Sequence, residues 1–487
     1  MNKSFSIGCL LAAVLLGASP PSAFAASLLE IYQQALQSDP LIHEADARRL
    51  AAEEVAPQAR GSLFPQLSAS GGWEQGASSG LQQQTVFDPD DPTIIRGFQT
   101  VETESDFDSF SWRADLRQTL FRWDQIVGLK QANKLVAKAA ADYEAAQQDL
   151  IIRVATRYFD VLAAEDVLTS IHADRLAIAR QLEQAKQRFE VGLIAITDVQ
   201  ESQAAYDQSV ASEIGAKRSL ATARQLLREI TGEYVSSLAA PADNFPLNNP
   251  NPASEEAWLD LAMSQNLAIV SSRLEEHVAR DEIAFRRTGH YPTVDLVASY
   301  ADSDSDISKV TIDGALTPNP DFPTGSTRDS IGIQFTVPLF EGGRVSSRVR
   351  EAVYLHRASL EQLQRVMRET ERQTRDAYLG VLAEISRVKA LKQAVESSRT
   401  ALNATQAGFE VGTRTIVDVL NSQFSLYEAI TNYYQSRYAY IGNVLLLKQA
   451  AGTLQIQDLE DIDRWLSERR PPEEVIAEDE ARENNES

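Results

Sequence analysis

The chain has 487 residues, enough for two or three ordinary domains or for one very elongated one. It is acidic, with a formal net charge of −23. This charge argues against nucleic acid as a partner, because phosphates demand a basic surface.

The first residues are typical of a signal peptide. Lys3 supplies the positive charge, residues 7–16 are almost wholly apolar, and Ala23-Phe24-Ala25 matches a small-x-small cleavage site. We expect residues 1–25 to be removed, which leaves no thiol for a disulfide, a nucleophile or a metal site. A lipoprotein anchored at Cys9 is the alternative, but the apolar run follows this cysteine instead of preceding it.

No later segment has the ~18 consecutive apolar residues of a transmembrane helix, so we expect a periplasmic protein or one that crosses the outer membrane as β-strands.

Alternating apolar and polar residues predict two β-strands in each half of the chain. The clearest run has one apolar and one polar face, formed by Phe110, Trp112, Ala114, Leu116 and Leu120 and by Ser111, Arg113, Asp115, Arg117 and Thr119. Similar runs cover 331–339, 67–73 and 294–300. Such alternation over about ten residues is typical of transmembrane strands that face lipid on one side and a water-filled lumen on the other. A half-buried sheet in a soluble protein is the alternative. We expect the acidic segments 88–108 and 302–321 to be extracellular loops.

Four strands cannot close a barrel, and open strand edges are not tolerated in lipid. A chain of this kind must therefore oligomerise, although its residues do not choose between two copies and three.

Proline is absent between Thr93 and Ala240 and again between Leu339 and Arg470, although the chain contains 18 prolines. Both windows are rich in helix-forming residues, so we predict two pairs of long helices, at about 124–190 and 195–231 and at about 344–410 and 415–451. The longest would measure about 100 Å. A heptad pattern typical of a coiled-coil seam runs through Leu129, Ala132, Val136, Ala139, Tyr143, Ala146 and Leu150. An ordinary two-helix coiled coil remains the alternative, because heptads do not show whether the helices enclose a lumen.

Gly192 and Gly412 mark the turns within the two helix pairs, because glycine tolerates the left-handed conformation that ends a helix. Asp198 and Asp418 follow in the first turns of the next helices, where negative charge favours the helix dipole. These turns belong to an internal repeat, in which FEVGLIAITDV at 189–199 corresponds to FEVGTRTIVDV at 409–419.

The repeat suggests a domain organisation. After the signal peptide we expect a first structural repeat at 26–240, a linker at 241–255 and a second repeat at 256–455. An equatorial segment at 456–472 and a disordered acidic tail at 473–487 would follow.

The five histidines lack the spacing of a zinc site, and no phosphate-binding loop, dinucleotide motif or nucleophile elbow occurs. We therefore expect no enzyme activity, no cofactor and no metal.

The order helix, strand, strand, long helix, turn and helix, written twice, resembles the TolC family. The matching motifs are RFEVGLIAITDVQ at 188–200, VGTRTIVDVL at 411–420 and VPLFEGG at 337–343. The resemblance implies a mainly α fold with transmembrane β-strands: a homotrimer with a twelve-stranded barrel, four strands from each chain, in outer-membrane lipid. A long α-helical barrel would continue it into the periplasm, with a mixed equatorial belt near residues 233–260 and 453–470.

The resemblance also implies a function, that of an outer-membrane exit duct for tripartite drug efflux or type I protein secretion. Such a duct is passive and gated at its periplasmic helical tips. Its partners would be a periplasmic adaptor protein and an inner-membrane pump of the RND, ABC or MFS type. The adaptor would dock at the tips, here Gly192, Leu193, Gly412 and Thr413.

By motif, the latch that holds the tips shut falls on Thr197, Asp198 and Arg414. Phe409 stands where the family pattern has a tyrosine, so a hydroxyl link to Asp198 cannot form. Asn421 stands where the pattern has a second aspartate at the constriction, and Asp418 remains. We therefore expect a looser latch and a less cation-attracting entrance.

Two other functions remain open. A trimeric coiled-coil adhesin on a membrane anchor is disfavoured, because each half folds its helices back. A periplasmic adaptor is disfavoured by the transmembrane-type strands.

Overall fold

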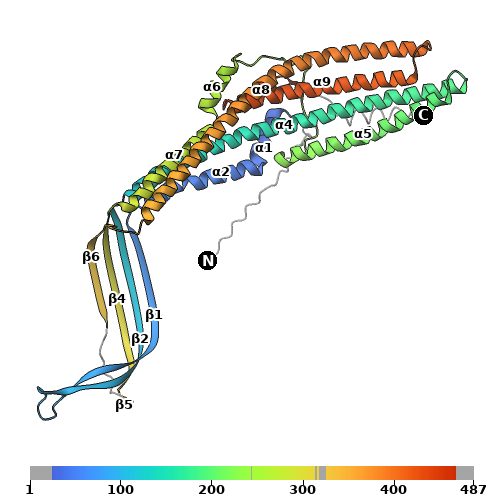
Figure 1. Ribbon diagram of the computed structural model, residues 1–487. Coiled ribbons are helices and arrows are strands. Elements are labelled where there is room, and N and C mark those ends of the chain that lie inside the picture. Colours follow the sequence, from blue (N-terminus) through green and yellow to red (C-terminus); the bar gives the residue numbers. More distant parts are fainter. Residues whose placement is uncertain (1–24, 243, 313–314, 317–324, 468–487) are drawn as a thin grey trace, which may run out of the picture. The chain divides into compact units, whose positions relative to one another are not determined.

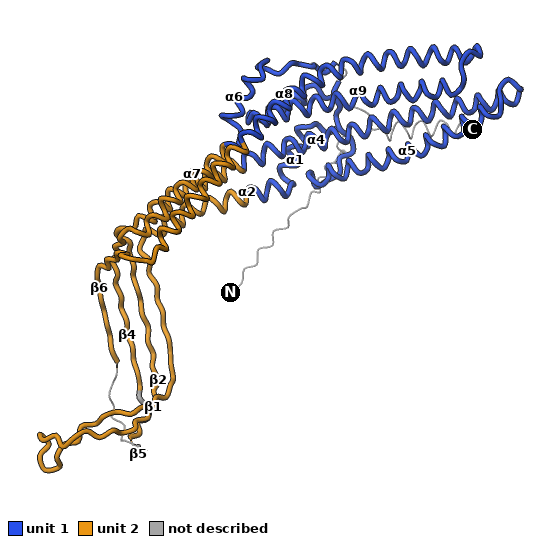
Figure 2. Tube along the Cα trace, in the orientation of Figure 1, with its two compact units in different colours: residues 1–46, 143–269, 367–487 blue, residues 47–142, 270–366 orange. Residues whose placement is uncertain are grey.

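The computed structural model describes residues 25–242, 244–312, 315–316 and 325–467. The expected signal peptide, apart from residue 25, and the expected acidic tail lie outside the described residues. Two compact units make up the chain, and each takes segments from both halves of the sequence. Unit 1 comprises residues 1–46, 143–269 and 367–487, and unit 2 comprises residues 47–142 and 270–366 (Figure 2). The division into two sequential repeats stays a prediction.

Unit 2 contains a sheet of four long antiparallel strands (Figure 1). They lie in the order β1 (Gln66–Phe87), β2 (Ile95–Phe121), β4 (Thr293–Ile312) and β6 (Ser326–Thr336). A two-residue strand, β5 (Ala315–Leu316), also pairs with β4. The register aligns Leu67, Leu116, Ala298 and Ile331 in one row across the sheet. The predicted alternation is therefore confirmed, because the apolar residues of all four strands share one face.

Most strand ends extend further than the alternation predicts, but β6 ends at Thr336, so the part of the predicted run at 337–339 is wrong. Glu102, Glu104, Asp106 and Asp108 lie on β2, so the expected loop at 88–108 is limited to residues 88–94, and the expectation is wrong for the rest. Asp302, Asp304 and Asp306 likewise lie on β4, whereas Asp313 and Asp321 fall outside the described residues. The reason is that ladder hydrogen bonds join backbones whatever their side chains, and strands can continue where no face is apolar. A bulge at the base of β2 also pairs Phe121, and not Leu120, with Val294.

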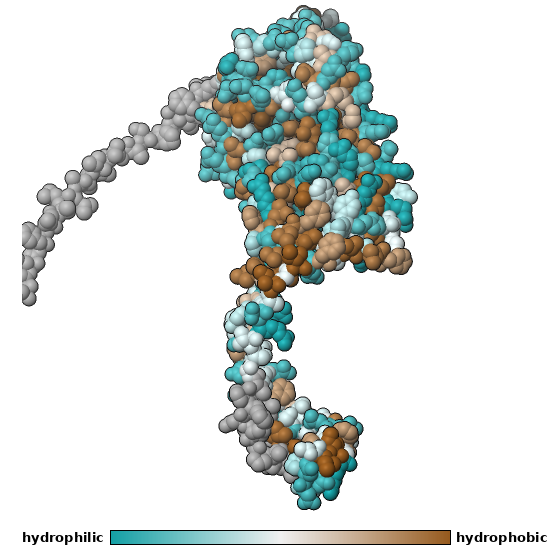
Figure 3. Space-filling view, turned by 90° about the vertical axis from the view of Figure 1, so that its left-hand side faces the viewer, coloured by the Kyte–Doolittle hydropathy of each residue, from teal (hydrophilic) through white to brown (hydrophobic). Residues whose placement is uncertain are grey.

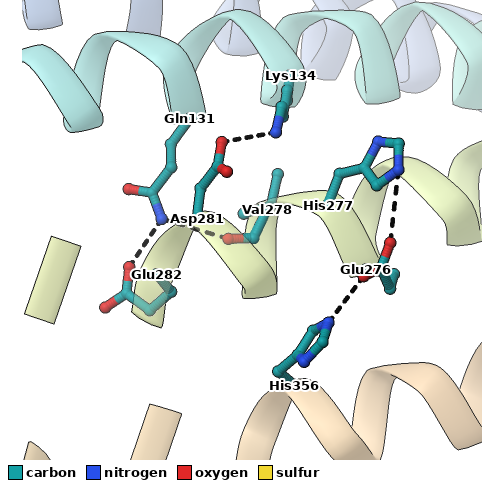
Figure 4. Close-up of polar contacts among 8 residues, drawn as sticks. All are labelled: Gln131, Lys134, Glu276, His277, Val278, Asp281, Glu282 and His356. Atoms are coloured by element: carbon teal, nitrogen blue, oxygen red, sulfur yellow. Dashed lines mark hydrogen bonds and ion pairs between the residues drawn. The ribbon is translucent and has the colours of Figure 1, made fainter. Parts of the chain in front are cut away.

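The helices of unit 2 are joined by polar contacts. They are α3 (Val55–Gly61), the 3₁₀ turn η1 (Thr288–His290) and the adjoining parts of α2 (Pro40–Glu53), α4 (Trp123–Glu190), α7 (Leu267–Arg287) and α8 (Arg344–Glu410). Lys134 of α4 contacts Asp281 of α7 at 2.6 Å. On another side of α7, Glu276 contacts His356 of α8 at 2.7 Å (Figure 4). These contacts tie α7 to both long helices.

Unit 1 holds the rest of the helices around an apolar core. It contains α1 (Leu28–Ser38), α5 (Ile196–Thr231), α6 (Glu255–Gln265), α9 (Ile416–Ala450), α10 (Ile456–Asp463) and the two-residue strands β3 (Ala240–Pro241) and β7 (Leu466–Ser467), which pair with each other. Tyr158 is fully buried in the core, and its hydroxyl donates to the carbonyl oxygens of Ala26 and Ala239. All four long helices begin and end within one or two residues of their predicted bounds.

Large apolar side chains lie exposed on the apolar face of the sheet, among them Leu67, Ile331, Ile333 and Phe335. The space-filling view also shows apolar surface gathered in a patch between more hydrophilic regions (Figure 3). Across the described part of the chain, none of the helices has both the length and the apolar character needed to cross a bilayer.

Candidate functional site

The candidate site is the pair of turns that join α4 to α5 and α8 to α9 (Figure 1). In the first turn, Gly192 has φ of 74°, and the Leu193 N–H donates to the carbonyl oxygen of Arg188 at 2.9 Å. This pattern ends a helix with a left-handed residue, which favours glycine. The Leu193 side chain is 73% exposed. The turn therefore presents an apolar side chain to its surroundings.

The second turn has the same backbone and a stronger helix start. Gly412 has φ of 80°, and the Thr413 N–H donates to the carbonyl oxygen of Gly408 at 2.8 Å. Thr415 and Asp418 form a capping box: the Asp418 carboxylate accepts the Thr415 N–H at 2.9 Å, and the Thr415 hydroxyl oxygen accepts the Asp418 N–H at 3.2 Å. The matching helix α5 begins after Ala195, which has no capping side chain.

Of the two residues expected at the constriction, Asp418 belongs to this cap and Asn421 lies just beyond it. The backbone and side-chain hydrogen bonds with Thr415, with a smaller effect of the Arg414 charge, hold the pKa of Asp418 below its ordinary value. Asn421 follows within a turn of the helix and is exposed. A ring built from Asp418 would therefore be ionised at every neutral or mildly acidic pH.

The expected latch residues are not brought together within one chain. Thr197 is exposed and Asp198 is half-buried, whereas the Arg414 side chain lies folded over Gly408 of its own turn. Among the described residues, no hydrogen bond or ion pair joins Arg414 to Thr197 or Asp198. The latch therefore stays a prediction.

Phe409 makes a different contact between the two helix pairs. The guanidinium of Arg188, at the end of α4, lies 5.1 Å from the centre of the Phe409 ring at the end of α8. A cation over an aromatic face is attractive by about 0.5–1 kcal/mol at a partly exposed site. Sequence reasoning missed this role of Arg188, because residues far apart in the chain show no pattern that pairs them.

A second polar level lies further from the tips. Gln423 of α9 is only 1% exposed. Its amide nitrogen donates to the Asp174 carboxylate and its amide oxygen accepts from Gln181, both at 2.8 Å. Burial raises the pKa of Asp174, and the hydrogen bond from Gln423 opposes this. Gln423 thus joins α9 to α4, a role that was not predicted from the sequence.

The described residues contain no group of three or more His, Cys, Asp or Glu arranged to hold a metal ion. The contacts at the tips are packing, capping and cation–π contacts, which can hold or release neighbouring helices.

The chain matches a known protein family in two segments, and each segment contains one of the two helix pairs. The family model described as "Outer membrane efflux protein" matches residues 31–233 and 258–453. The chain belongs to this family. It is 36% identical over 459 residues to the outer membrane protein TolC of Vibrio cholerae, with 94% of this chain and 98% of that protein covered.

Two further comparisons extend the likeness. The alkaline protease secretion protein AprF of Pseudomonas aeruginosa is 29% identical, with 90% of this chain and 87% of that protein covered. The solved structure of the CmeC outer membrane channel of Campylobacter jejuni matches with a TM-score of 0.69 at 15% identity, covering 96% of this chain and 97% of that one. The expected fold class is confirmed. As an outer membrane efflux protein, the chain resides in the outer membrane and serves as an exit duct.

Proposed function

We propose that three copies of this chain form the passive exit duct of a tripartite drug-efflux machine or of a type I protein-secretion machine. The observation that carries the proposal is the sheet of unit 2, which is apolar on one face and polar on the other. Within the described strands, β1 pairs only with β2 and β6 is held only by β4, so both edges are open. Neighbouring copies can satisfy these edges, and three copies supply twelve long strands.

The exposed tips support a docking role. Leu193 is 73% exposed and Val411 is 74% exposed, and each lies beside the glycine of its turn. Exposed apolar side chains beside Gly192, Gly412 and Thr413 suit a periplasmic adaptor that brings the duct to an inner-membrane pump. The pump would be of the RND, ABC or MFS type and would supply the energy. The chain would act on no substrate chemically and would need no cofactor.

Gating at the tips is the regulated step. We infer that Arg414 links to Thr197 and Asp198 when copies pack side by side, and that Asp418 lines the narrowest point. The Arg188–Phe409 contact takes the place of a hydroxyl link at this level. Opening would separate the two helix pairs at their tips, below the buried Gln423 contacts.

The first test of the duct is conductance. Protein purified from outer membranes should be trimeric by mass in detergent and should give small, steady single-channel currents in a planar bilayer. Arg414→Ala should raise the conductance, because loss of a charge-assisted link shifts the closed–open equilibrium roughly tenfold towards the open state. Arg218→Ala, an exposed change on α5, is the control. Unchanged conductance in Arg414→Ala would refute the latch.

The pH dependence of ion selectivity tests the constriction. Because the pKa of Asp418 is lowered, the carboxylate stays charged as the pH falls to about 4, and its charge is lost only below that lowered pKa. Reversal potentials in a salt gradient should therefore show an unchanged cation preference between pH 7 and about 4. Thr415→Val removes the side-chain hydrogen bond and keeps the larger backbone one, so the cation preference should begin to fade at a higher pH than in the wild type. A preference that survives in Asp418→Ala would exclude this residue as its source.

A further inference from the structure

We propose that the polar face of the sheet carries an arginine tier that binds anionic groups of molecules leaving through the duct. The tier is formed by Arg113, Arg117 and Arg328 in unit 2. The inference rests on the proposed trimeric duct, since only a closed barrel turns this face towards a lumen. It adds a substrate class, namely molecules with several phosphate, sulfonate or carboxylate groups.

The strand register places these arginines opposite to the apolar face. Leu116 lies in the row with Leu67, Ala298 and Ile331, whereas the next residue along β2, Arg117, points to the other side. Arg113 has the same parity as Arg117, so both are on the polar face. Serine, glycine and glutamine dominate this face in the adjoining rows, at Gln66, Ser68, Ser70, Ser299, Ser330 and Gly332.

The upper row of the tier holds two arginines. Arg113 of β2 is opposite Ala301 of β4, and Ala301 is opposite Arg328 of β6. Two strand spacings put these backbones about 10 Å apart, and the small Ala301 side chain leaves the space between them open. Arg113 donates to Asp115 at 2.7 Å, but its side chain is still 58% exposed. Arg328 is also exposed, and no ion pair to another described residue engages it.

At the lower end of the tier, a carboxylate is shared between two arginines. Asp295 of β4 is only 3% exposed and contacts Arg117 at 2.5 Å and Arg122 at 3.5 Å. Its negative charge is therefore covered, whereas the Arg117 side chain is 52% exposed. An Arg117 guanidinium held at one edge can still offer its remaining N–H donors to an anion.

The balance of charge on this face is opposite to that of the whole chain. Among the paired residues of this segment of the face, three arginines (Arg113, Arg117 and Arg328) meet two aspartates (Asp115 and Asp295), so each chain has one excess positive charge and a trimer has three. The next charged residue on the same face is Glu74, two rows further along. A chain with a net charge of −23 thus concentrates cations in one short segment of its proposed lumen. Charges that converge inside a low-dielectric wall focus their field on the passing solute.

Guanidinium groups give the tier its chemical preference. Each presents a planar fork of donors that matches the oxygens of phosphate and carboxylate groups, so a solute with several such groups can engage more than one arginine. A neutral solute would lack the charge that these forks bind.

The test uses inositol hexakisphosphate, a compact polyanion, added to the extracellular side of single channels of the full-length protein. We expect a concentration-dependent block. The Arg113→Gln, Arg328→Gln double variant should weaken it by about tenfold or more, because each lost guanidinium removes a charge-assisted contact. Arg328→Lys should keep most of the block, since it keeps the charge. Uncharged inositol should not block any variant.

The outcomes separate this inference from the duct itself. Conducting trimers that are blocked equally well in the wild type and the double variant would overturn the arginine tier and leave the duct intact. Protein that did not conduct would overturn the duct. Calorimetric titration of the detergent-solubilised protein with the same polyanion would then decide the tier: equal binding by wild type and double variant would reject it, and weaker binding by the double variant alone would support it.

Discussion

Replacing Gly452 by alanine should lower the free energy of unfolding by about 2–5 kcal/mol, because a left-handed backbone and a steric clash act together. Gly452 ends α9 with φ of 73°. A Cβ atom there would lie 2.3 Å from the backbone carbonyl oxygen of Gln265. Backbone at that position cannot swing aside as a flexible side chain can, so α9 and the segment after α6 would have to separate.

The sequence repeat supplies the control for this change. Gly232 ends α5 with φ of 78°, but a Cβ atom there would lie 3.4 Å from the Cβ of Ser38. Gly232→Ala should therefore cost only the left-handed conformation, about 1–2 kcal/mol. Denaturation of the purified protein, followed by circular dichroism, would measure both. Equal decreases in the free energy of unfolding in the two variants would show that the close approach to Gln265 adds nothing to the cost of Gly452→Ala.

Glu213→Ala should destabilise the α4–α5 pair by about 3 kcal/mol, because it removes the carboxylate from a buried charge cluster. Glu213 is 4% exposed and contacts Arg175 at 2.6 Å and Lys217 at 2.9 Å. His172 also lies 3.4 Å from the same carboxylate. Burial alone would raise the pKa of Glu213, but the hydrogen bond from Lys217 and the charges of Arg175 and Lys217 outweigh it, and the pKa is lowered. The carboxylate thus contributes stability above its ordinary pKa, and this contribution is lost as the pH falls through the lowered value.

The matched control is Glu229→Ala, an exposed change on the same helix. It should stay within about 0.5 kcal/mol of the wild type. Chemical denaturation at pH 7 and near pH 4 should show that the difference in the free energy of unfolding between Glu213→Ala and Glu229→Ala becomes smaller in acid. Equal free energies of unfolding at pH 7 would contradict the prediction, because they would mean that Arg175, Lys217 and His172 rearrange without cost when the carboxylate is lost.

The long helices could be predicted from the sequence because two independent signals agree. The absence of proline sets their extent, and Gly192 and Gly412 mark the turns between them. The strands were predicted only where one face is apolar, from Phe110 to Leu120 and in the matching runs. The acidic continuation of β2 through Glu102 and Asp108 escaped prediction, because the backbone ladder that pairs it does not require an apolar face.

The tips were predicted as turns, but their contacts were not. A repeat motif locates Gly192, Asp198, Gly412 and Asp418, since each has a local backbone reason. The Arg188–Phe409 and Gln423–Asp174 contacts depend on how one helix pair packs against the other, which no local pattern records.

The capping box at Thr415 and Asp418 has a consequence for how such a protein can change over time. One carboxylate both secures the first turn of α9 and supplies the charge proposed for the entrance. A mutation of Asp418 that alters ion preference therefore also destabilises the start of α9. Asp198 is not part of a capping box, so a mutation there would not destabilise the start of α5 in this way. We therefore expect substitutions that adapt the duct to new cargo to accumulate more readily in the turn at Gly192 than in the turn at Gly412.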